Sequence, residues 1–275
     1  MQNKPSLWYN KIKFPTADDN KYTRGYAVIL GGTDGKLGAA KLASLAALRC
    51  GAGLVTICCS TEAFTPYQAW AVSVMIHKND TVKEFVDFIE DECVKAILIG
   101  PGCGVNERTK QIVLEALRLK KPCVLDADAI TVFQHNPEEL FDNTHHNVVL
   151  TPHIGEFSRI FDIDKIDRIK SVIDAAKKAG CTVLLKGGKT IIASLDGKVV
   201  VNNNAPPCLA TAGSGDVLSG IITGLVTTGI LAFDAACIAT WVHGEAGKIC
   251  GTGMISEDLT KAIKDIMKNL EHYGV

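Results

Sequence analysis

The sequence predicts an α/β fold in which a mostly parallel central sheet lies between two layers of helices. Its strand candidates are near-continuous hydrophobic runs, which are typical of parallel strands buried on both faces. Segments with helical spacing separate these runs, and this alternation favours parallel pairing. With 275 residues, 47% of them hydrophobic and 21% charged, the chain can bury a substantial core. We expect one domain over residues 1–275, with residues 1–20 as a loosely packed lead-in segment.

Six hydrophobic runs are strand candidates: Tyr26–Leu30, Leu54–Cys58, Ala96–Ile99, Cys123–Leu125, Val148–Leu150 and Thr182–Leu185. Helical spacing between them predicts helices over Ala39–Cys50, Glu107–Lys120, Ile154–Phe161 and Ile166–Ala179. Asp196-Gly197 lies between two further β-rich runs, Thr190–Leu195 and Val199–Val201, and predicts a hairpin at the sheet edge. From Asp216 onward the pattern is helical, over roughly residues 216–228, 233–250 and 257–271.

Composition excludes several classes of protein. A formal net charge of -1 favours neither a nucleic-acid partner nor an anionic membrane. The first residues lack the apolar core and cleavage site of a secretory signal, and no run has the length of a membrane span, so we expect a cytoplasmic protein. The ten cysteines include no Cys-x-x-Cys pair and are expected to be mainly reduced, buried thiols. His145-His146 has no other ligand nearby in sequence, so no metal site is predicted there.

Glycine and polar residues follow the predicted strands. Because ligands of open α/β sheets bind at the carboxyl ends of the strands, these segments form one candidate site. They are Gly31-Gly32-Thr33, Gly100-Pro-Gly-Cys-Gly104, Asp126-Ala-Asp128, Thr151-Pro-His153 and Lys186-Gly-Gly-Lys-Thr190. Their convergence at one end of the sheet indicates an enzyme acting on a phosphate-rich ligand.

The run Ala210–Gly224 is the most informative stretch. Gly213 and Gly215 flank Ser214, and a glycine turn at a helix start exposes backbone N–H groups that bind phosphate. Asp216 follows at once, although a carboxylate repels phosphate. Its position is explained if Asp216 takes the proton from a hydroxyl that attacks a phosphorus held by those N–H groups. An ordinary acidic first turn of a helix is the alternative.

The other segments carry weaker signals. Neither Gly35-Lys36 nor Gly188-Lys189-Thr190 has the spacing of a P-loop, and the glycines after Gly100 lack the dinucleotide fingerprint. Lys186–Thr190 offers contacts for phosphate or adenosine, or is a β-turn with solvated lysines. His153 either bonds a substrate or is solvated. Asp126 and Asp128 could orient a lysine, bind Mg²⁺ through water or cap the next helix.

Taken together, the motifs resemble the ADP/ATP-dependent NAD(P)H-hydrate dehydratases, which have a ribokinase-like three-layer sandwich fold. The resemblance runs from about Arg24 to the last helix. Its motifs, in order, are Gly31-Gly-Thr33, Gly38-Ala-Ala40, Ala46–Thr56, Gly100–Gly104, Leu125–Ala129, Thr151–Phe157, Lys186–Thr190 and Thr211–Gly220. The sequence departs from the family pattern at Lys36, Ile154 and Ser214, where an aromatic residue, proline and threonine are usual.

The resemblance implies roles for individual residues. It places Ala39, Gly104, His153 and Asp216 against the hydrated nicotinamide nucleotide, with Asp216 also catalytic. It assigns adenosine-phosphate binding to Lys186, Gly187, Gly188, Lys189, Thr190 and Gly215, and an anion hole to Gly213, Ser214 and Gly215. ADP or ATP would be the co-substrate, with Mg²⁺ bound, whereas protein ligands to the metal stay unknown.

The implied reaction is dehydration of the S epimer of NAD(P)H-hydrate, by phosphorylation of the ring hydroxyl and elimination of phosphate. The resemblance also implies a homotetramer and a separate epimerase acting in the same pathway. One alternative is a kinase of a vitamin-precursor alcohol, such as a hydroxymethylpyrimidine or hydroxyethylthiazole, whose product keeps the phosphoryl group. A non-catalytic nucleotide-sensing module is another, and it would bind without turnover.

Overall fold

One sheet runs through the computed structural model, which describes residues 1–32, 35–164 and 166–272. Its nine strands have the order β3-β2-β1-β4-β5-β6-β7-β8-β9. The strands are β1 (Tyr26–Leu30), β2 (Leu54–Cys59), β3 (Met75–Lys78), β4 (Val94–Ile99), β5 (Cys123–Leu125), β6 (Val148–Leu150), β7 (Thr182–Leu185), β8 (Thr190–Ala193) and β9 (Val199–Asn202). β3 to β7 pair in parallel, and β7, β8 and β9 pair antiparallel. The predicted mostly parallel sheet is therefore confirmed.

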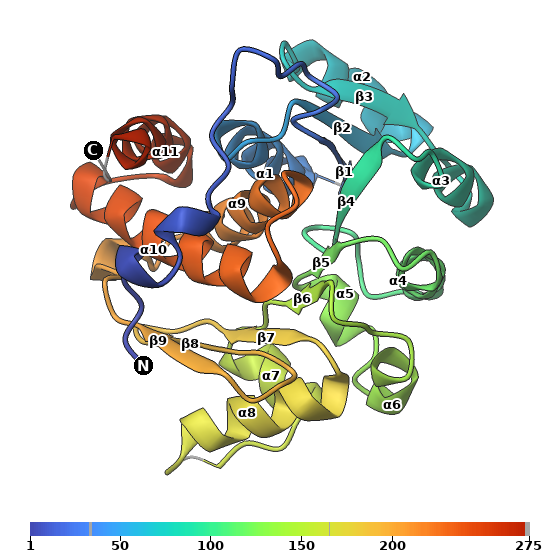
Figure 1. Ribbon diagram of the computed structural model, residues 1–275. Helices are drawn as coiled ribbons and strands as arrows, with labels where there is room; N and C mark the ends of the chain where they lie inside the picture. Colours follow the sequence, from blue (N-terminus) through green and yellow to red (C-terminus); the bar gives the residue numbers. More distant parts are fainter. Residues whose placement is uncertain (33–34, 165, 273–275) are drawn as a thin grey trace.

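Helices cover both faces of the sheet (Figure 1). On one face lie α1 (Leu37–Arg49), α2 (Thr61–Trp70), α9 (Ser214–Thr227), α10 (Ala232–Cys250) and α11 (Ser256–Glu271). On the other lie α3 (Val82–Ile89), α4 (Glu107–Arg118), α5 (Asp128–Thr131), α6 (Pro137–Phe141), α7 (Ile154–Ile160) and α8 (Arg168–Ala179). Short 3₁₀ turns occur at Pro5–Leu7, Tyr9–Lys11 and Pro207–Leu209. The arrangement is a three-layer sandwich.

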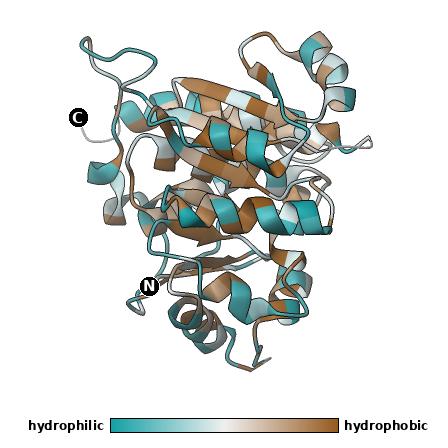
Figure 2. Cartoon of the chain, turned by 90° about the vertical axis from the view of Figure 1, so that its right-hand side faces the viewer, coloured by the Kyte–Doolittle hydropathy of each residue, from teal (hydrophilic) through white to brown (hydrophobic). Residues whose placement is uncertain are grey.

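Burial explains why the strands read as continuous hydrophobic runs. Along β1, Ala27 and Ile29 belong to the core beneath α1 and α9, whereas Val28 and Leu30 belong to the core beneath α3 and α4. Successive side chains of a strand point to opposite faces, so both sets must be apolar when both faces are covered. Figure 2 shows the hydrophobic strands inside and hydrophilic turns on the outer helices.

The close packing of α9 against α1 depends on small residues. A Cβ at Gly220 would lie 2.3 Å from the carbonyl oxygen of Ala43, and one at Gly224 would lie 2.4 Å from that of Ala47. Real side chains cannot approach a backbone so closely, so both positions require glycine. This contact fixes the position of α9 relative to α1.

The expectation of a loosely packed lead-in is wrong for its first twelve residues. Trp8 is 1% exposed, and its indole Nε1–H donates to Oδ1 of Asn3 at 2.9 Å. Asn3 in turn donates through Nδ2 to the carbonyl oxygen of Cys237 at 2.7 Å. The Trp8 ring packs edge-on against Trp241, with centroids 5.5 Å apart. Burial of the Trp8 ring against α10 therefore anchors the N-terminal segment to the rest of the protein.

The hydrophobic pattern predicts no helix or strand in two stretches where the structure has them. The chain from Thr61 to Ile89 forms α2, β3 and α3, and residues 128–141 contain the short helices α5 and α6. β3 carries half-exposed residues at the sheet edge, so it lacks the hydrophobic run that marks the inner strands. Among the described residues, no helix combines the length and the apolar character needed to cross a membrane. Thr33, of the first predicted glycine segment, lies outside the described residues.

Candidate active site

The carboxyl ends of β4 to β7 meet as predicted, because backbone hydrogen bonds continue past the ends of the strands. The N–H of Asp126 donates to the carbonyl oxygen of Ile99 at 3.1 Å, and that of Thr151 donates to Leu125 at 3.1 Å. The N–H of Lys186 donates to Pro152 at 2.8 Å, which makes a parallel bridge between His153 and Lys186. Asp126, His153 and Lys186 are thus brought side by side.

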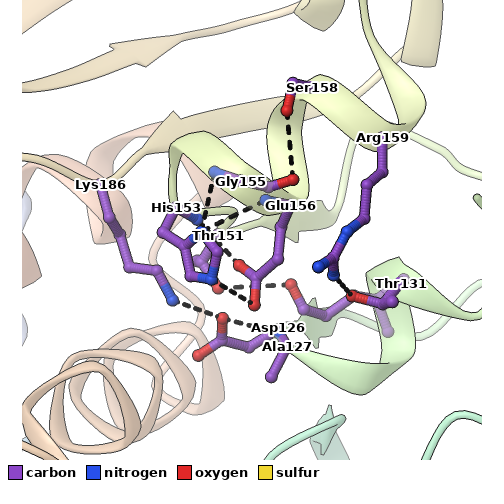
Figure 3. A network of polar contacts seen from close by, with 11 residues as sticks. Asp126, Ala127, Thr131, Thr151, His153, Gly155, Glu156, Ser158, Arg159 and Lys186 are labelled. Carbon is purple, nitrogen blue, oxygen red and sulfur yellow. Dashed lines mark hydrogen bonds and ion pairs between the residues drawn. The ribbon is translucent and has the colours of Figure 1, made fainter.

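A buried ion pair lies at the centre of this edge (Figure 3). Nζ of Lys186 lies 2.7 Å from Oδ1 of Asp126, whose residue is 1% exposed. The same oxygen accepts the N–H of Ala127 at 2.9 Å. Burial by itself lowers the pKa of Lys186, but the carboxylates of Asp126, Glu156 and Asp216 outweigh it and leave the pKa raised. Lys186 is therefore charged at neutral pH.

The N-terminus of α9 faces this pair. Gly213 caps the helix in the left-handed conformation, with φ of +86°, and a Cβ there would lie 2.6 Å from Cδ1 of Leu42. A Cβ at Gly215 would lie 3.4 Å from Nζ of Lys186, so the ammonium reaches the first turn of α9. The N–H groups of a first turn have no partner within their helix. These N–H groups and the Lys186 ammonium are the donors that this end of the sheet offers to an anion, beside the carboxylates of Asp126 and Asp216.

Asp216 has the protonation behaviour of a general base. Burial raises its pKa, the negative charge of Asp126 raises it further, and Lys186 opposes them, with a result of about 6. A carboxylate with this pKa is ionised at neutral pH yet accepts a proton more readily than an ordinary aspartate. The Asp126 carboxylate is instead held through Oδ1 by Lys186 and by the N–H of Ala127.

His153 takes part in a cap as well as in the site. Its Nδ1 accepts the N–H groups of Gly155 at 2.9 Å and Glu156 at 3.2 Å. Glu156 returns the contact, since its Oε2 accepts the N–H of His153 at 2.8 Å. With Nδ1 an acceptor, the ring proton belongs on Nε2, which lies 3.4 Å from Oε1 of Glu156. The side chain of His153 is 55% exposed, so part of the ring can contact a ligand although Nε2 faces Glu156.

The predicted contacts Ala39 and Gly104 lie at a second part of the edge. Ala39 is in the first turn of α1 and is half-buried. The N–H of Gly104 donates to Oδ2 of Asp128 at 2.8 Å, which leaves its carbonyl oxygen for other partners. Asp128 therefore anchors the 100–104 loop. A Cβ at Gly32 would lie 2.9 Å from the carbonyl oxygen of Gly102, so the glycine loops after β1 and β4 touch through their backbones.

A cavity of about 320 Å³ adjoins Lys186. Its walls include Gly187, Gly188 and Lys189 together with apolar side chains, of which Ile154 and Ile169 were not predicted as site residues. Thr190 is 5% exposed, and its hydroxyl donates to the carbonyl oxygen of Gly187 at 3.2 Å. Thr190 thus closes the turn of the 186–190 loop. A slot with apolar walls beside a fixed ammonium suits an adenosine phosphate.

Sequence reasoning missed His243 on α10. Its Nε2 lies 3.0 Å from Oγ of Ser214, and the ring is 8% exposed. Burial lowers the pKa of His243 to about 4, so the ring is neutral. The Ser214 hydroxyl of the predicted anion hole is therefore engaged with a side chain from another helix. The helical pattern of residues 233–250 contains no signal that singles out this histidine.

The described residues contain no group of three or more His, Cys, Asp or Glu side chains that could hold a metal ion. Mg²⁺ in proteins is often bound by one or two carboxylates together with substrate phosphates and water. The cavity of about 560 Å³ lined by Trp8, Leu231 and Phe233 contains none of the predicted site residues.

A mostly parallel sheet of this order between two layers of helices is the fold of the ribokinase-like class of α/β proteins. A family model for NAD(P)H-hydrate dehydratases matches residues 27–269. The chain belongs to the NAD(P)H-hydrate dehydratase family.

Individual relatives agree with this assignment. The chain is 34% identical over 263 residues to the ADP-dependent (S)-NAD(P)H-hydrate dehydratase of Neisseria meningitidis serogroup B, covering 90% of this chain and 86% of that protein. It is 31% identical to the bifunctional NAD(P)H-hydrate repair enzyme Nnr of Escherichia coli, covering 94% of this chain. The chain spans about half the length of such bifunctional relatives, at 50% of the E. coli protein.

The fold agrees with a solved structure. The ADP/ATP-dependent NAD(P)H-hydrate dehydratase from Bacillus subtilis, co-crystallized with ATP/Mg2+, superimposes with a TM-score of 0.88 at 27% identity. The match covers 98% of each chain.

Proposed function

We propose that the chain dehydrates the S epimer of NAD(P)H-hydrate to NAD(P)H at the expense of ADP or ATP. The observation that carries the proposal is Asp216, whose pKa is about 6 and which lies in the first turn of α9 near the Lys186 ammonium. This arrangement supplies both requirements of phosphoryl transfer to an alcohol, a base for the hydroxyl proton and positive charge for the phosphoryl oxygens.

The first step is phosphorylation of the ring hydroxyl. Asp216 takes the hydroxyl proton while the oxygen attacks the terminal phosphorus of ADP or ATP, and the phosphoanhydride bond breaks to release AMP or ADP. First-turn N–H groups of α9 and Lys186 stabilise the charge on the phosphoryl oxygens. The nucleotide would lie along the 186–190 loop, with its base in the cavity walled by Ile154 and Ile169. Mg²⁺ bound to the phosphates would neutralise part of their charge.

The second step is elimination of phosphate, a far better leaving group than hydroxide. The lone pair of the ring nitrogen expels phosphate from the adjacent carbon, and a proton then leaves the neighbouring ring carbon. The ring double bond is restored, and the products are NAD(P)H, phosphate and AMP or ADP. Retention of the phosphoryl group on the product would instead identify an alcohol kinase.

Several further features belong to the same proposal. The single sheet supports one domain over residues 1–275. The proposal includes a homotetramer, which light scattering would test, and a cytoplasmic location, which cell fractionation would test. It also needs a supply of the S epimer, so an epimerase must act on the same substrate pool.

The proposal is tested by adding purified protein to hydrated NADH with Mg²⁺ and either ADP or ATP, and following the near-ultraviolet absorbance of the dihydronicotinamide ring. Recovery of absorbance in the wild type, and its loss in Asp216→Asn, is expected. Asp87→Asn, which breaks only an exposed ion pair with Lys83 on α3, is the matched control. Folded wild-type protein that gives no recovery with either nucleotide would overturn the proposal.

A further inference from the structure

The buried pair of Lys186 and Asp126 has a geometry that ordinary packing does not require. The Lys186 ammonium lies between the Asp126 carboxylate, at 2.7 Å, and the first turn of α9, where a Cβ at Gly215 would be 3.4 Å away. Positive charge at the N-terminus of a helix opposes the helix dipole. Burying both charges also carries a desolvation penalty that a single ion pair seldom repays. The helix dipole opposes a cation at this position, and the neighbouring carboxylates are what keep Lys186 charged there.

The backbone around Asp126 is built to hold this side chain in place. Ala127 has φ of +48°, a conformation that residues with a side chain rarely adopt. The Asp126 carboxylate accepts the N–H of that same residue. A Cβ at Gly100 would lie 1.7 Å from the carbonyl oxygen of Asp126, so only glycine allows the two segments to approach. The position of the carboxylate is therefore determined by β4 and β5 together.

We propose that Asp126 is a positioning residue that holds the Lys186 ammonium over the first turn of α9, so that the cation faces the phosphoryl group as it is transferred. This inference rests on the proposed function. Without Asp126, the four-carbon stem of Lys186 would be free to move toward Asp216 or solvent. With it, the cation is in place before the nucleotide arrives, so little reorganisation accompanies the reaction.

Asp126 and Lys186 both influence the protonation of Asp216. The charged groups that act on Asp216 are Asp126 after β5 and Lys186 after β7. Glu156 on α7 acts on Lys186, and His243 on α10 is neutral. Asp126 raises the pKa of Asp216 and Lys186 lowers it. Removal of Asp126 therefore shifts the acid limb of the pH–activity profile to lower pH, and removal of Lys186 shifts it to higher pH. Loss of a purely structural contact would not produce these opposite shifts.

The test uses Asp126→Asn, Lys186→Met and the double variant, with Asp87→Asn as control. In Asp126→Asn we expect kcat to fall about tenfold and the acid limb to move to lower pH. In Lys186→Met we expect a fall on the order of 10²-fold, as for loss of one charge-stabilising donor, and a move to higher pH. If Asp126 acts through Lys186, removing it from Lys186→Met lowers kcat little further. Titration calorimetry with ADP measures nucleotide affinity in each variant.

Folding and activity are separated within the same set. Removal of one partner from a buried pair leaves an unpaired charge, whereas the double variant leaves none. If Asp126→Asn does not fold, the double variant therefore still reports whether kcat matches that of Lys186→Met. The inference is overturned if the wild type is active but Asp126→Asn keeps its kcat and acid limb, or if the two substitutions lower kcat independently. Absence of wild-type turnover would instead reject the proposed function.

Discussion

Asp216→Asn should stabilise the folded protein at neutral pH while abolishing its activity. The raised pKa of Asp216 means that the folded state disfavours the charged carboxylate. Asparagine has nearly the same shape and no charge, so it removes this penalty. The ionised side chain of Asp216 is therefore expected to lower the free energy of unfolding of the wild type.

The size of the effect follows from the shift. Raising the pKa from 3.8 to about 6 corresponds to at most about 3 kcal/mol of lost stability once the group is charged. The carboxyl group is only partly buried, so solvent screening leaves about 1–2 kcal/mol. The α9 dipole favours a first-turn carboxylate by about 0.3–1 kcal/mol, which subtracts from this. A net gain of about 1 kcal/mol raises the melting temperature by about 2–4 °C.

The pH dependence of the stability difference between Asp216→Asn and the wild type shows whether the charge on Asp216 is its cause. Below pH 3.8 the carboxyl group is protonated in both folded and unfolded states, and the substitution changes little. Above about pH 6 it is charged in both states, and the folded wild type bears the whole penalty. Thermal unfolding at a series of pH values should therefore show an advantage for Asp216→Asn that appears between these values. Equal or lower stability of the variant at about pH 8, or an advantage independent of pH, would refute the reasoning.

Three other outcomes are expected. The rate of dehydration should fall below about pH 6 as Asp216 becomes protonated, and a profile flat to below pH 5 would exclude it as the base. Gly220→Ala should destabilise by about 1–3 kcal/mol through its clash with α1, whereas Gly38→Ala, which meets nothing within 4 Å, should not; thermal unfolding measures both. Trp8→Ala should lower the unfolding free energy by about 3–5 kcal/mol in denaturant titration, and a loss under about 1 kcal/mol would contradict the packing of the N-terminal segment.

Much of the fold could be predicted because the physics behind it is local. Thr182–Leu185 was predicted with the bounds of β7, and Cys123–Leu125 and Val148–Leu150 with those of β5 and β6. Strands buried on both faces must be apolar throughout, so their bounds coincide with the hydrophobic runs. The edge strand β3 was not predicted because its side chains are partly exposed and need not all be apolar. The packing of Trp8 was missed for a different reason, since the ring against which it packs, Trp241, belongs to a helix near the other end of the chain.

The sequence by itself determined that polar and glycine segments follow consecutive parallel strands and that Asp216 opens a helix with exposed N–H groups. Those features depend on chain order and on the common polarity of the strands. Only the tertiary structure decided which neighbour each group has. It paired Lys186 with Asp126, raised the pKa of Asp216 by burial, set His243 against Ser214 and placed Nδ1 of His153 in a helix cap. Hydrogen bonds and charge interactions act over a few ångströms. The order of strands in the sheet brings these distant residues within that range, and no single segment of the sequence determines that order.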